Sequence, residues 1–309
     1  MNALIEAAVG NNMGRIRTNN EDNFYLNGTS LSRETMNTGG LFQMKSKNRL
    51  QIYAVCDGMG GEDAGEESAL MAVETIREFQ AGAQDSVSNE RIRQMIEKAS
   101  DRIRQFSAQR GFRSGTTMAM VAVQGTRARM VHVGDSRIYL LREKKFRQMT
   151  VDHSLVYEMV ARGELTREEA RVHPLKNRIT QYVGLSPEDG IVSPSISDEI
   201  ALQGGDVLLL CSDGLSDMVE DEQIGRILSQ NPEMGAAATA LVREAVSNGG
   251  KDNVTAMCLK YLQAVPEDKS VDDGLGGQRV KLAVYRLCAT LFGAGFAVAL
   301  GDLLYYLFS

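Results

Sequence analysis

Short apolar runs, most of them ended by glycine, aspartate or serine, recur along residues 1–262 of the chain. They are rich in Val, Ile, Leu and Tyr and have the length of β-strands, so they predict strands. The predicted strands cover residues 51–56, 117–124, 127–133, 137–142, 206–211 and 254–262.

Between these runs, apolar side chains return at the spacing of an α-helix. In one such stretch Ile92, Ile96, Ala99 and Ile103 fall on a single helical face. Strands and helices follow one another without a break in composition, which predicts one mixed α+β domain over residues 1–263. The predicted helices cover residues 66–80, 88–109, 221–230 and 234–247.

The pattern changes beyond residue 263. Residues 264–281 are mostly polar and aperiodic, which predicts a flexible linker. Residues 282–309 are mainly apolar, with Asp302 as the only charge after Arg286, and a helix of this length spans the roughly 30 Å core of a bilayer. We therefore expect a C-terminal membrane helix at 282–309. The alternative is a helix docked on the surface of the preceding domain.

Arg279, Lys281 and Arg286 lie on the linker side of this apolar run. By the positive-inside rule they place residues 1–263 in the cytoplasm, anchored at the inner membrane.

Composition narrows the classes of function. Hydrophobic residues make up 43% and charged residues 24% of the chain, as in globular proteins. The net charge of −6 and the pI near 5.3 argue against a nucleic-acid partner. The four cysteines form no C-x-x-C pair, so neither a zinc knuckle nor a disulfide framework is predicted.

Acidic residues stand where several predicted strands begin or end. Asp57 and Asp213 each follow an apolar run, in VCDGMGG and LLLCSDGLSD, and Asp252 opens the last strand in KDNVT. Glu21 and Asp22 form a further pair in RTNNED. A single Asp-Gly is an ordinary turn, but turns do not require acids at all of these positions together.

Strand ends that meet at one edge of a sheet would bring these carboxylates together, along with Asp135 of VHVGDSR. Two carboxylates about 4 Å apart repel by roughly 4 kcal/mol at an effective dielectric near 20, and bound cations relieve that repulsion. Oxygen ligands without Cys or His favour Mn²⁺ or Mg²⁺ over zinc. Gly58 has no Cβ, so its carbonyl can approach an ion closely.

Arg17, four residues before Glu21, suggests a guanidinium that holds a phosphate. Two metals about 3.5–4 Å apart can clamp a phosphoryl group and activate a water for in-line attack, without a protein nucleophile. The sequence lacks the residues that two other phosphatase mechanisms require at the expected positions. No arginine follows a cysteine by six positions, and Asp57 does not begin an Asp-x-Asp motif.

The chain resembles the protein phosphatase 2C family, the metal-dependent serine/threonine protein phosphatases, and especially its bacterial members. The resemblance runs from about residue 14 to residue 259 and implies an α/β/β/α sandwich, two antiparallel β-sheets flanked by helices, with metals at one end. Its motifs, in order, are GRIRTNNED, VCDGMGGEDAGEESA, SGTTMAMV, VHVGDSRIYLLR, MTVDHSL, HPLKNRITQYVG, LLLCSDGLSD and GGKDNVT.

The resemblance implies which residues hold the two Mn²⁺ or Mg²⁺ ions. Asp57 would bridge both ions. Glu21 and the Gly58 carbonyl would serve one of them, and Asp213 and Asp252 would serve the other.

By the same resemblance, Asp22 would orient the metal-bound water and Arg17 would hold the substrate phosphate. Asp135 and Asp217 would contribute to a third metal position of the kind that bacterial members show. Met59 departs from animal relatives, which carry a histidine there that is proposed as the general acid. Methionine donates no proton, so the acid would be metal-bound water or another residue.

His153 is a tempting substitute for that acid because histidine titrates near neutrality, but a structural role is favoured. Residues 150–190 resemble the family's flap beside the active site, which shapes substrate choice. Thr116 and Thr117 are expected to support the strand and nearby hydrogen bonds rather than act as nucleophiles.

The expected function is hydrolysis of phosphoserine and phosphothreonine in proteins, reversing the action of a serine/threonine kinase. The expected partners are that kinase, its phosphorylated substrates and the membrane. Two alternatives are a catalytically silent phosphoprotein-binding module on a membrane tether and a hydrolase of small phosphate esters. The first would require missing ligands, and the second shares every catalytic residue.

Overall fold

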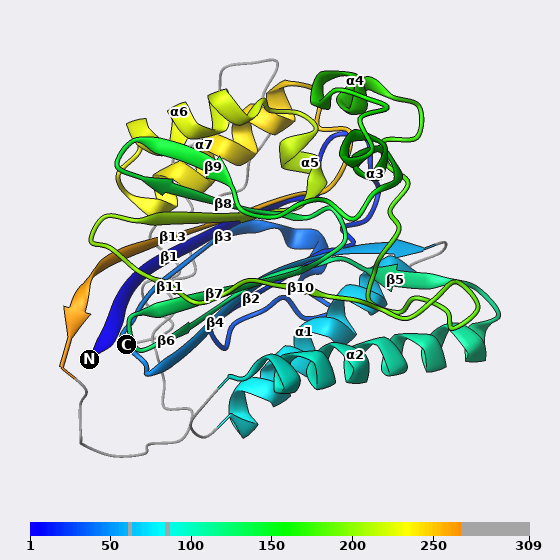
Figure 1. Cartoon of the computed structure of the whole chain (residues 1–309), viewed down its shortest axis with the longest axis horizontal. Helices are drawn as coiled ribbons and strands as arrows, with labels where there is room; N and C mark the ends of the chain where they lie inside the picture. Colours follow the sequence, from blue (N-terminus) through cyan, green and yellow to red (C-terminus); the bar gives the residue numbers. More distant parts are fainter. Residues whose placement is uncertain (61–63, 84–86, 267–309) are drawn as a thin grey trace, which may run out of the picture.

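The computed structural model describes residues 1–60, 64–83 and 87–266. In this part of the chain two antiparallel β-sheets stack face to face, and helices cover both outer faces (Figure 1). The predicted α/β/β/α sandwich is therefore confirmed.

The first sheet has the strand order β3-β1-β13-β12-β8-β9. β1 (Asn2–Asn12) and β13 (Val254–Val265) pair along their whole length, so the two ends of the described chain lie side by side. The other strands are β3 (Gly40–Ser46), β12 (Val207–Cys211), β8 (Arg137–Arg142) and β9 (Lys145–Gln148).

The second sheet is built around β4 (Leu50–Gly60), which lies between β2 (Asp22–Leu26) and β6 (Met118–Gln124). Asp22 of β2 pairs in register with Asp57 of β4, so the sheet itself puts two of the predicted site residues next to each other. The remaining strands are β5 (Ser114–Thr116), β7 (Arg127–Val133), β10 (Ser195–Ile196) and β11 (Ile200–Ala201).

All four predicted helices are present, with bounds close to those expected. α1 (Ala64–Gly82) and α2 (Asn89–Arg110) cover the second sheet, and α6 (Asp221–Gln230) and α7 (Met234–Ser247) cover the first. The sequence did not predict three short helices and a 3₁₀ turn. These are α3 (Leu155–Ala161), α4 (Arg167–Val172), α5 (Asp213–Ser216) and the turn Met36–Thr38.

Strand β12 shows how the layers are held together. Leu208 and Leu210 point into the core between the two sheets, whereas Leu209 points to the opposite face and packs in the cluster beneath α6 and α7. All three are buried, since successive side chains of a strand face opposite sides and both sides of this strand are covered. The wholly apolar run of β12 follows from this double burial.

The sequence did not predict β1, β2 or β3. β1 reads NALIEAAVGNN, with Ala, Asn and Gly in place of the branched residues that mark strands, although most of its residues are buried. Pairing with β13 and β3 on its two sides overrides this weak propensity. β13 itself continues to Val265, two residues past the predicted domain end at 263.

None of the helices in the described residues has the length and hydrophobicity that a bilayer span requires. The predicted membrane helix at 282–309 and most of the predicted linker at 264–281 lie outside the described residues.

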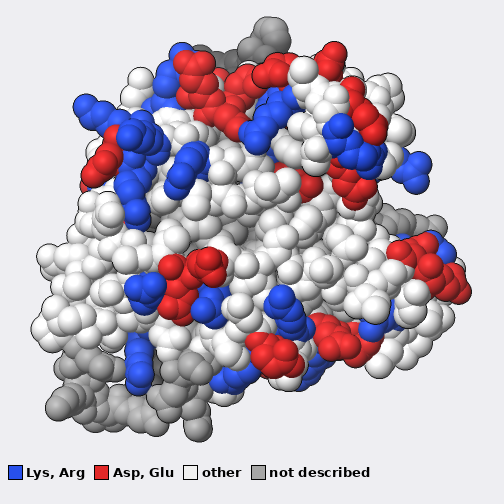
Figure 2. Space-filling model, viewed as in Figure 1, with Lys and Arg blue, Asp and Glu red and all other residues white. Residues whose placement is uncertain are grey.

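Charged side chains of both signs are intermixed on the face drawn in Figure 2. Mixed clusters lie over the upper and lower helical layers, and an uncharged band crosses the molecule between them. Ion pairs on such a surface are short-ranged and contribute little stability.

We expect Leu210→Ala to lower the free energy of unfolding by about 2–5 kcal/mol, because it removes a fully buried side chain from the core between the sheets. Urea unfolding followed by circular dichroism measures the change. Arg93→Ala, at an exposed position of α2, is the control and should change stability by less than about 0.5 kcal/mol. Equal losses in the two variants would contradict this account of the core.

Candidate active site

Asp57 lies inside strand β4, whereas the sequence had suggested that it follows the end of the strand. The strand pairs with β6 as far as Val55 and with β5 from Gly58 onward. The Asp57 N–H donates to Thr117 Oγ1 at 3.0 Å. Its carbonyl accepts from the Thr117 N–H at 2.8 Å and from Thr116 Oγ1 at 2.9 Å. The two threonines therefore fix the Asp57 backbone, in the supporting role expected of them.

Gly58 is packed so closely that no larger residue fits. A Cβ at this position would lie 2.0 Å from the Gly65 carbonyl oxygen and 2.7 Å from that of Glu21. The Gly58 N–H donates to the Glu21 carbonyl at 3.1 Å. A Cβ on Gly65 would in turn lie 2.9 Å from Glu21 Oε2. The Glu21 carboxylate and the backbone of Gly58 thus meet at the first turn of α1.

Asp22 is fully buried and held by two hydroxyl groups from the opposite sheet. Its Oδ2 accepts from Ser212 Oγ at 2.7 Å and from Thr255 Oγ1 at 2.6 Å. Its Oδ1 is buried without a hydrogen-bond partner. Burial raises the pKa of Asp22 to about 7; the hydroxyls of Thr255 and Ser212 oppose this shift, and the charges of Asp213 and Asp252 add to it.

A cluster of acids surrounds Asp57. Burial, reinforced by the charges of Asp22, Asp213 and Asp135, raises the pKa of Asp57 well above its ordinary value. Burial and the charge of Asp213 do the same to the pKa of Asp135. Burial also raises the pKa of Asp213 to about 7, with help from Asp217, while a side-chain hydrogen bond with Asp57 opposes the shift. Sequence segments far apart in the chain thus converge on one acidic cluster.

Arg17 lies at the exposed rim of this cluster. Its Nη2 donates to Asp252 Oδ2 at 2.8 Å, and the two side chains are 47% and 35% exposed. The hydrogen bond to Asp252 raises the pKa of Arg17, and the charges of Glu21 and Asp57 add to the shift, which shows that all four groups are neighbours. The arginine is thus available to an anion that approaches from solvent.

Asn253 fastens the segment that carries Arg17 to the start of β13. Its side-chain amide donates to the carbonyls of Met13 and Asn19, both at 2.9 Å, and its oxygen accepts from the Glu21 N–H at 2.8 Å. Asn253 was not among the site residues predicted from the sequence. Its position directly after Asp252 was the available signal.

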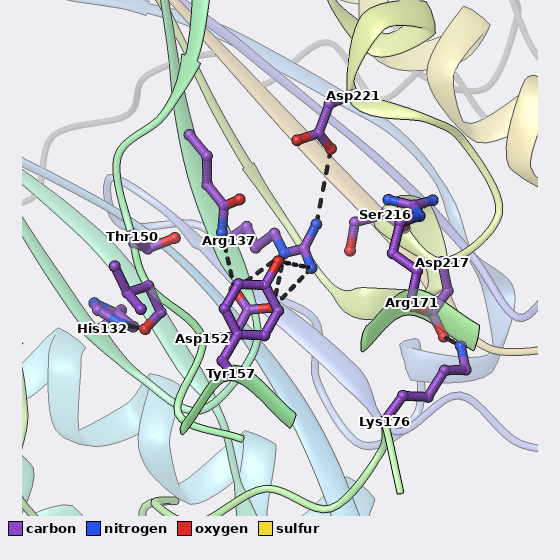
Figure 3. Close-up of polar contacts among 12 residues, drawn as sticks. His132, Arg137, Thr150, Asp152, Tyr157, Arg171, Lys176, Ser216, Asp217 and Asp221 are labelled. Carbon is purple, nitrogen blue, oxygen red and sulfur yellow. Dashed lines mark hydrogen bonds and ion pairs between the residues drawn. The ribbon is translucent and has the colours of Figure 1, made fainter. Parts of the chain in front are cut away.

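Beside the acidic cluster, a buried ion pair joins β8 to the flap (Figure 3). Arg137 Nε and Nη2 donate to both oxygens of Asp152 at 2.7–3.0 Å, and the two side chains are only 9% and 5% exposed. Arg137 also donates to the hydroxyls of Tyr139 and Tyr157, each at 3.1 Å, and lies 3.7 Å from Asp221. The guanidinium is thus fully engaged and positions the start of the flap.

The middle of the flap reaches the end of α5. Lys176 forms an ion pair with Asp217, the residue expected at a third metal position. Arg171 donates to the Ser216 carbonyl at 3.2 Å (Figure 3). It also lies 3.0 Å from Glu220. These contacts close a small cavity whose lining includes Asp135, Asp213 and Asp217.

The histidines in the flap root are structural. The His132 and His153 rings stack with centroids 4.4 Å apart. His153 Nδ1 accepts from the Gly134 N–H at 3.2 Å, and its Nε2 bonds Ser195 Oγ at 2.9 Å. Burial lowers the pKa of His153 to about 4. Both ring nitrogens are occupied, in agreement with the structural role that the sequence favoured.

The oxygen donors at this edge fit a hard divalent cation by their chemistry. Asp22 Oδ1 is buried without a partner, and the neighbouring carboxyls repel one another, so bound cations would satisfy both. As they stand, however, no three His, Cys, Asp or Glu side chains in the described residues are grouped so that they could hold an ion. Asp252 and Asp217 pair with Arg17 and Lys176 instead. Cation binding would therefore require these pairs to open.

Several known proteins are similar to this chain. Residues 37–247 match the family model described as protein phosphatase 2C. Protein phosphatase PhpP of Streptococcus pneumoniae is 34% identical over 258 residues, which cover 81% of this chain and 95% of that protein.

Solved structures agree. The Mycobacterium tuberculosis serine/threonine phosphatase PstP/Ppp superposes with a TM-score of 0.70 at 30% identity, covering 84% of this chain and all of the other. A PstP catalytic domain in complex with two manganese ions has a TM-score of 0.68 at 29% identity, covering 84% and 99% of the two chains.

We expect Asp152→Asn to destabilise the protein by about 3–5 kcal/mol, because it leaves the buried Arg137 guanidinium without its counter-charge. Urea unfolding measures the loss. Glu199→Gln is the matched control, since Glu199 pairs with Arg127 and Arg129 near the surface and should cost less than about 1 kcal/mol. If both variants lost the same small amount, the buried pair would not hold the flap root.

Proposed function

Because this chain belongs to the protein phosphatase 2C family and is a serine/threonine protein phosphatase, we propose that it hydrolyses phosphoserine and phosphothreonine in proteins and so reverses a serine/threonine kinase. The observation that carries the proposal is the juxtaposition of the buried Asp22 and the half-buried Asp57 and Asp213 with the exposed guanidinium of Arg17. The buried acids repel one another and so favour cations, while the guanidinium favours an anion.

Mn²⁺ or Mg²⁺ is the proposed cofactor, as two ions with a third position. Asp57, Glu21 and the Gly58 carbonyl would hold one ion, and Asp57, Asp213 and Asp252 the other. When bound, the ions neutralise phosphoryl charge and activate a water.

Asp135 and Asp217 would serve the third position. Lys176 now pairs with Asp217, so this position competes with a flap contact.

The protein's own groups supply binding and orientation. The Arg17 guanidinium is a fork of donors that matches two phosphate oxygens, and its Nη2 now donates to Asp252 Oδ2. Ser212 and Thr255 donate to Asp22 Oδ2, whereas no group of the described residues donates to Oδ1, so Oδ1 would accept a hydrogen bond from a water. Asp22 is therefore the residue that orients the attacking water.

The proton donor to the leaving hydroxyl remains a solvent group in this proposal. Met59 carries no proton, and His153 is held on both ring nitrogens by Gly134 and Ser195. Neither residue is given a part in the chemistry.

The two alternative functions differ in what they require. A silent phosphoprotein-binding module would lack ligands, yet Glu21, Asp22, Asp57, Asp213 and Asp252 are all present. A small-ester hydrolase would use the same residues, and it differs in showing no preference for phosphopeptides over esters such as p-nitrophenyl phosphate. Comparison of the two rates in Mn²⁺ separates these functions.

We also propose that the catalytic domain, residues 1–263, is tethered to the inner face of a membrane by residues 282–309 through a linker at 264–281. Support comes from the sequence alone, namely the apolar run after Arg286 and the basic residues before it.

EDTA should abolish phosphopeptide hydrolysis and Mn²⁺ should restore it. Asp57→Asn and Asp252→Asn should each reduce turnover on the order of 100-fold or more, because each removes a ligand charge. The measurement is phosphate release from a phosphothreonine peptide. Asp198→Asn, in an exposed loop, is the control and should keep wild-type turnover. Near-normal turnover in either ligand variant would refute the two-metal site.

The full chain should remain with membranes after an alkaline carbonate wash, whereas a chain ending at Val265, which retains all of β13, should be released. Immunoblotting of pellet and supernatant reads the outcome. Equal release of both chains would rule out the anchor.

A further inference from the structure

An open groove of about 420 Å³ lies beside β5, at the end of α2. One wall comes from Phe112 and Arg113, which lead into β5, and from Arg104 of α2. The other wall comes from Tyr182 and Pro187, in the C-terminal part of the flap. The proposed mechanism uses none of these residues.

The groove is continuous with the catalytic edge through β5. Thr116, at one end of this strand, donates from its hydroxyl to the Asp57 carbonyl, and the strand pairs with Gly58–Gly60 of β4. Thr116 also exchanges two backbone hydrogen bonds with Val183, at 3.0 and 2.8 Å. The flap wall is thereby bonded to β5 and the other wall leads into it, and β5 pairs with the strand that carries Asp57.

Glycines give the aromatic wall its shape. A Cβ on Gly115 would lie 2.3 Å from Tyr182 Cδ2, so the tyrosine ring rests directly on the backbone of β5. Gly184 has a φ of +102°, and a Cβ there would lie 2.5 Å from Ile103 Cγ2. Each contact excludes a side chain, which fixes the ring of Tyr182 against the strand rather than leaving it free in solvent.

The groove presents an apolar floor with a charged rim. The Phe112 ring meets Phe106 at 5.7 Å, edge to face. Arg113 lies 2.8 Å from Asp189 and 3.4 Å from Glu188, and these three side chains are 67%, 40% and 81% exposed. Exposed pairs of this kind are weak, so an incoming chain displaces them at little cost.

We propose that this groove is a substrate subsite, which binds an apolar or aromatic side chain of the phosphoprotein three or four residues away from the phosphorylated residue. The inference rests on the proposed function and specifies its substrate. Thr116 at the catalytic edge and Phe112 in the groove are four residues apart, and extended chain rises about 3.3 Å per residue. At most about 13 Å therefore separate Thr116 from Phe112, a distance that three or four extended substrate residues nearly or fully span.

The occupant is a polypeptide segment because the groove adjoins the site that takes the phosphorylated residue. An aromatic side chain would stack on Tyr182 and Phe112 within their usual contact geometry. The adjacent guanidinium of Arg113 suits a backbone carbonyl or an acidic neighbour.

The test uses the full chain in Mn²⁺ and phosphothreonine peptides that carry one Phe or one Ser at each position from two to five residues on either side. Wild type should favour Phe about tenfold in kcat/KM at a position three or four residues away, through KM. Phe112→Ser and Tyr182→Ser should each remove that preference and lose more on the Phe peptide than on p-nitrophenyl phosphate. Ile191→Ser, which alters a residue that is 86% exposed and outside the groove, should keep the wild-type preference.

Equal kcat/KM for all peptides in wild type would overturn the subsite while leaving the phosphatase function intact, whereas absence of any hydrolysis would refute the proposed function itself. A parallel fall on peptide and ester in both groove variants would show damage to the catalytic edge and would also overturn the subsite. The subsite would also be overturned if the groove bound a second copy of the chain. Sedimentation would then reveal a dimer that Phe112→Ser dissociates without any change in peptide preference.

Discussion

Mutual repulsion among acids buried at one end of two stacked sheets is the constraint around which the rest of this structure is arranged. Asp22 is buried, and Asp57 and Asp213 are half-buried. Burial raises the pKa of all three, and the charges of Asp22 and Asp213 add to the shift at Asp57. An isolated buried carboxylate is costly, and a group of them is costlier. The fold tolerates this because the sites sit on strands whose other residues form three buried apolar clusters. The stability of the cores thus offsets an edge that is poor in stabilising contacts.

Two kinds of partner reduce the repulsion in the described residues. Hydroxyls of Ser212 and Thr255 reach from one sheet to Asp22 in the other, so the edge is bridged across the sandwich. Basic side chains pair with the outer acids, as Arg17 does with Asp252. Asp22 Oδ2 is held by two neutral donors, whereas the outer acids Asp252 and Asp217 have partly exposed basic partners. Cations and phosphate can therefore displace the outer contacts without disturbing the scaffold.

The sequence predicted the parts of this arrangement that depend on local pattern. Helices with clear periodicity, such as α6 and α7, matched their expected bounds, as did the apolar run of β12. β1 was not predicted because its alanines and asparagines are buried by pairing with β13, a strand more than 240 residues away. Asn253 and Thr255 were not predicted for the same reason, since their hydrogen-bond partners lie in the segment before β2 and in β2 itself. The sequence motifs identified the acidic residues. The hydrogen-bond donors that hold these residues become apparent only from the pairing of segments that are far apart in the sequence.

The flap is bonded to the catalytic edge at several points, and this limits how substrate choice can vary. Its root is fixed by the Arg137–Asp152 pair and by His153, whose backbone and ring both bond Gly134, next to Asp135. Its far end joins β5 through Val183. Changes in the flap backbone would therefore move Asp135 or the strand beside Asp57. Side chains that only line the adjoining groove do not hold the catalytic edge in this way, so substrate specificity can change there while the acidic residues stay in place.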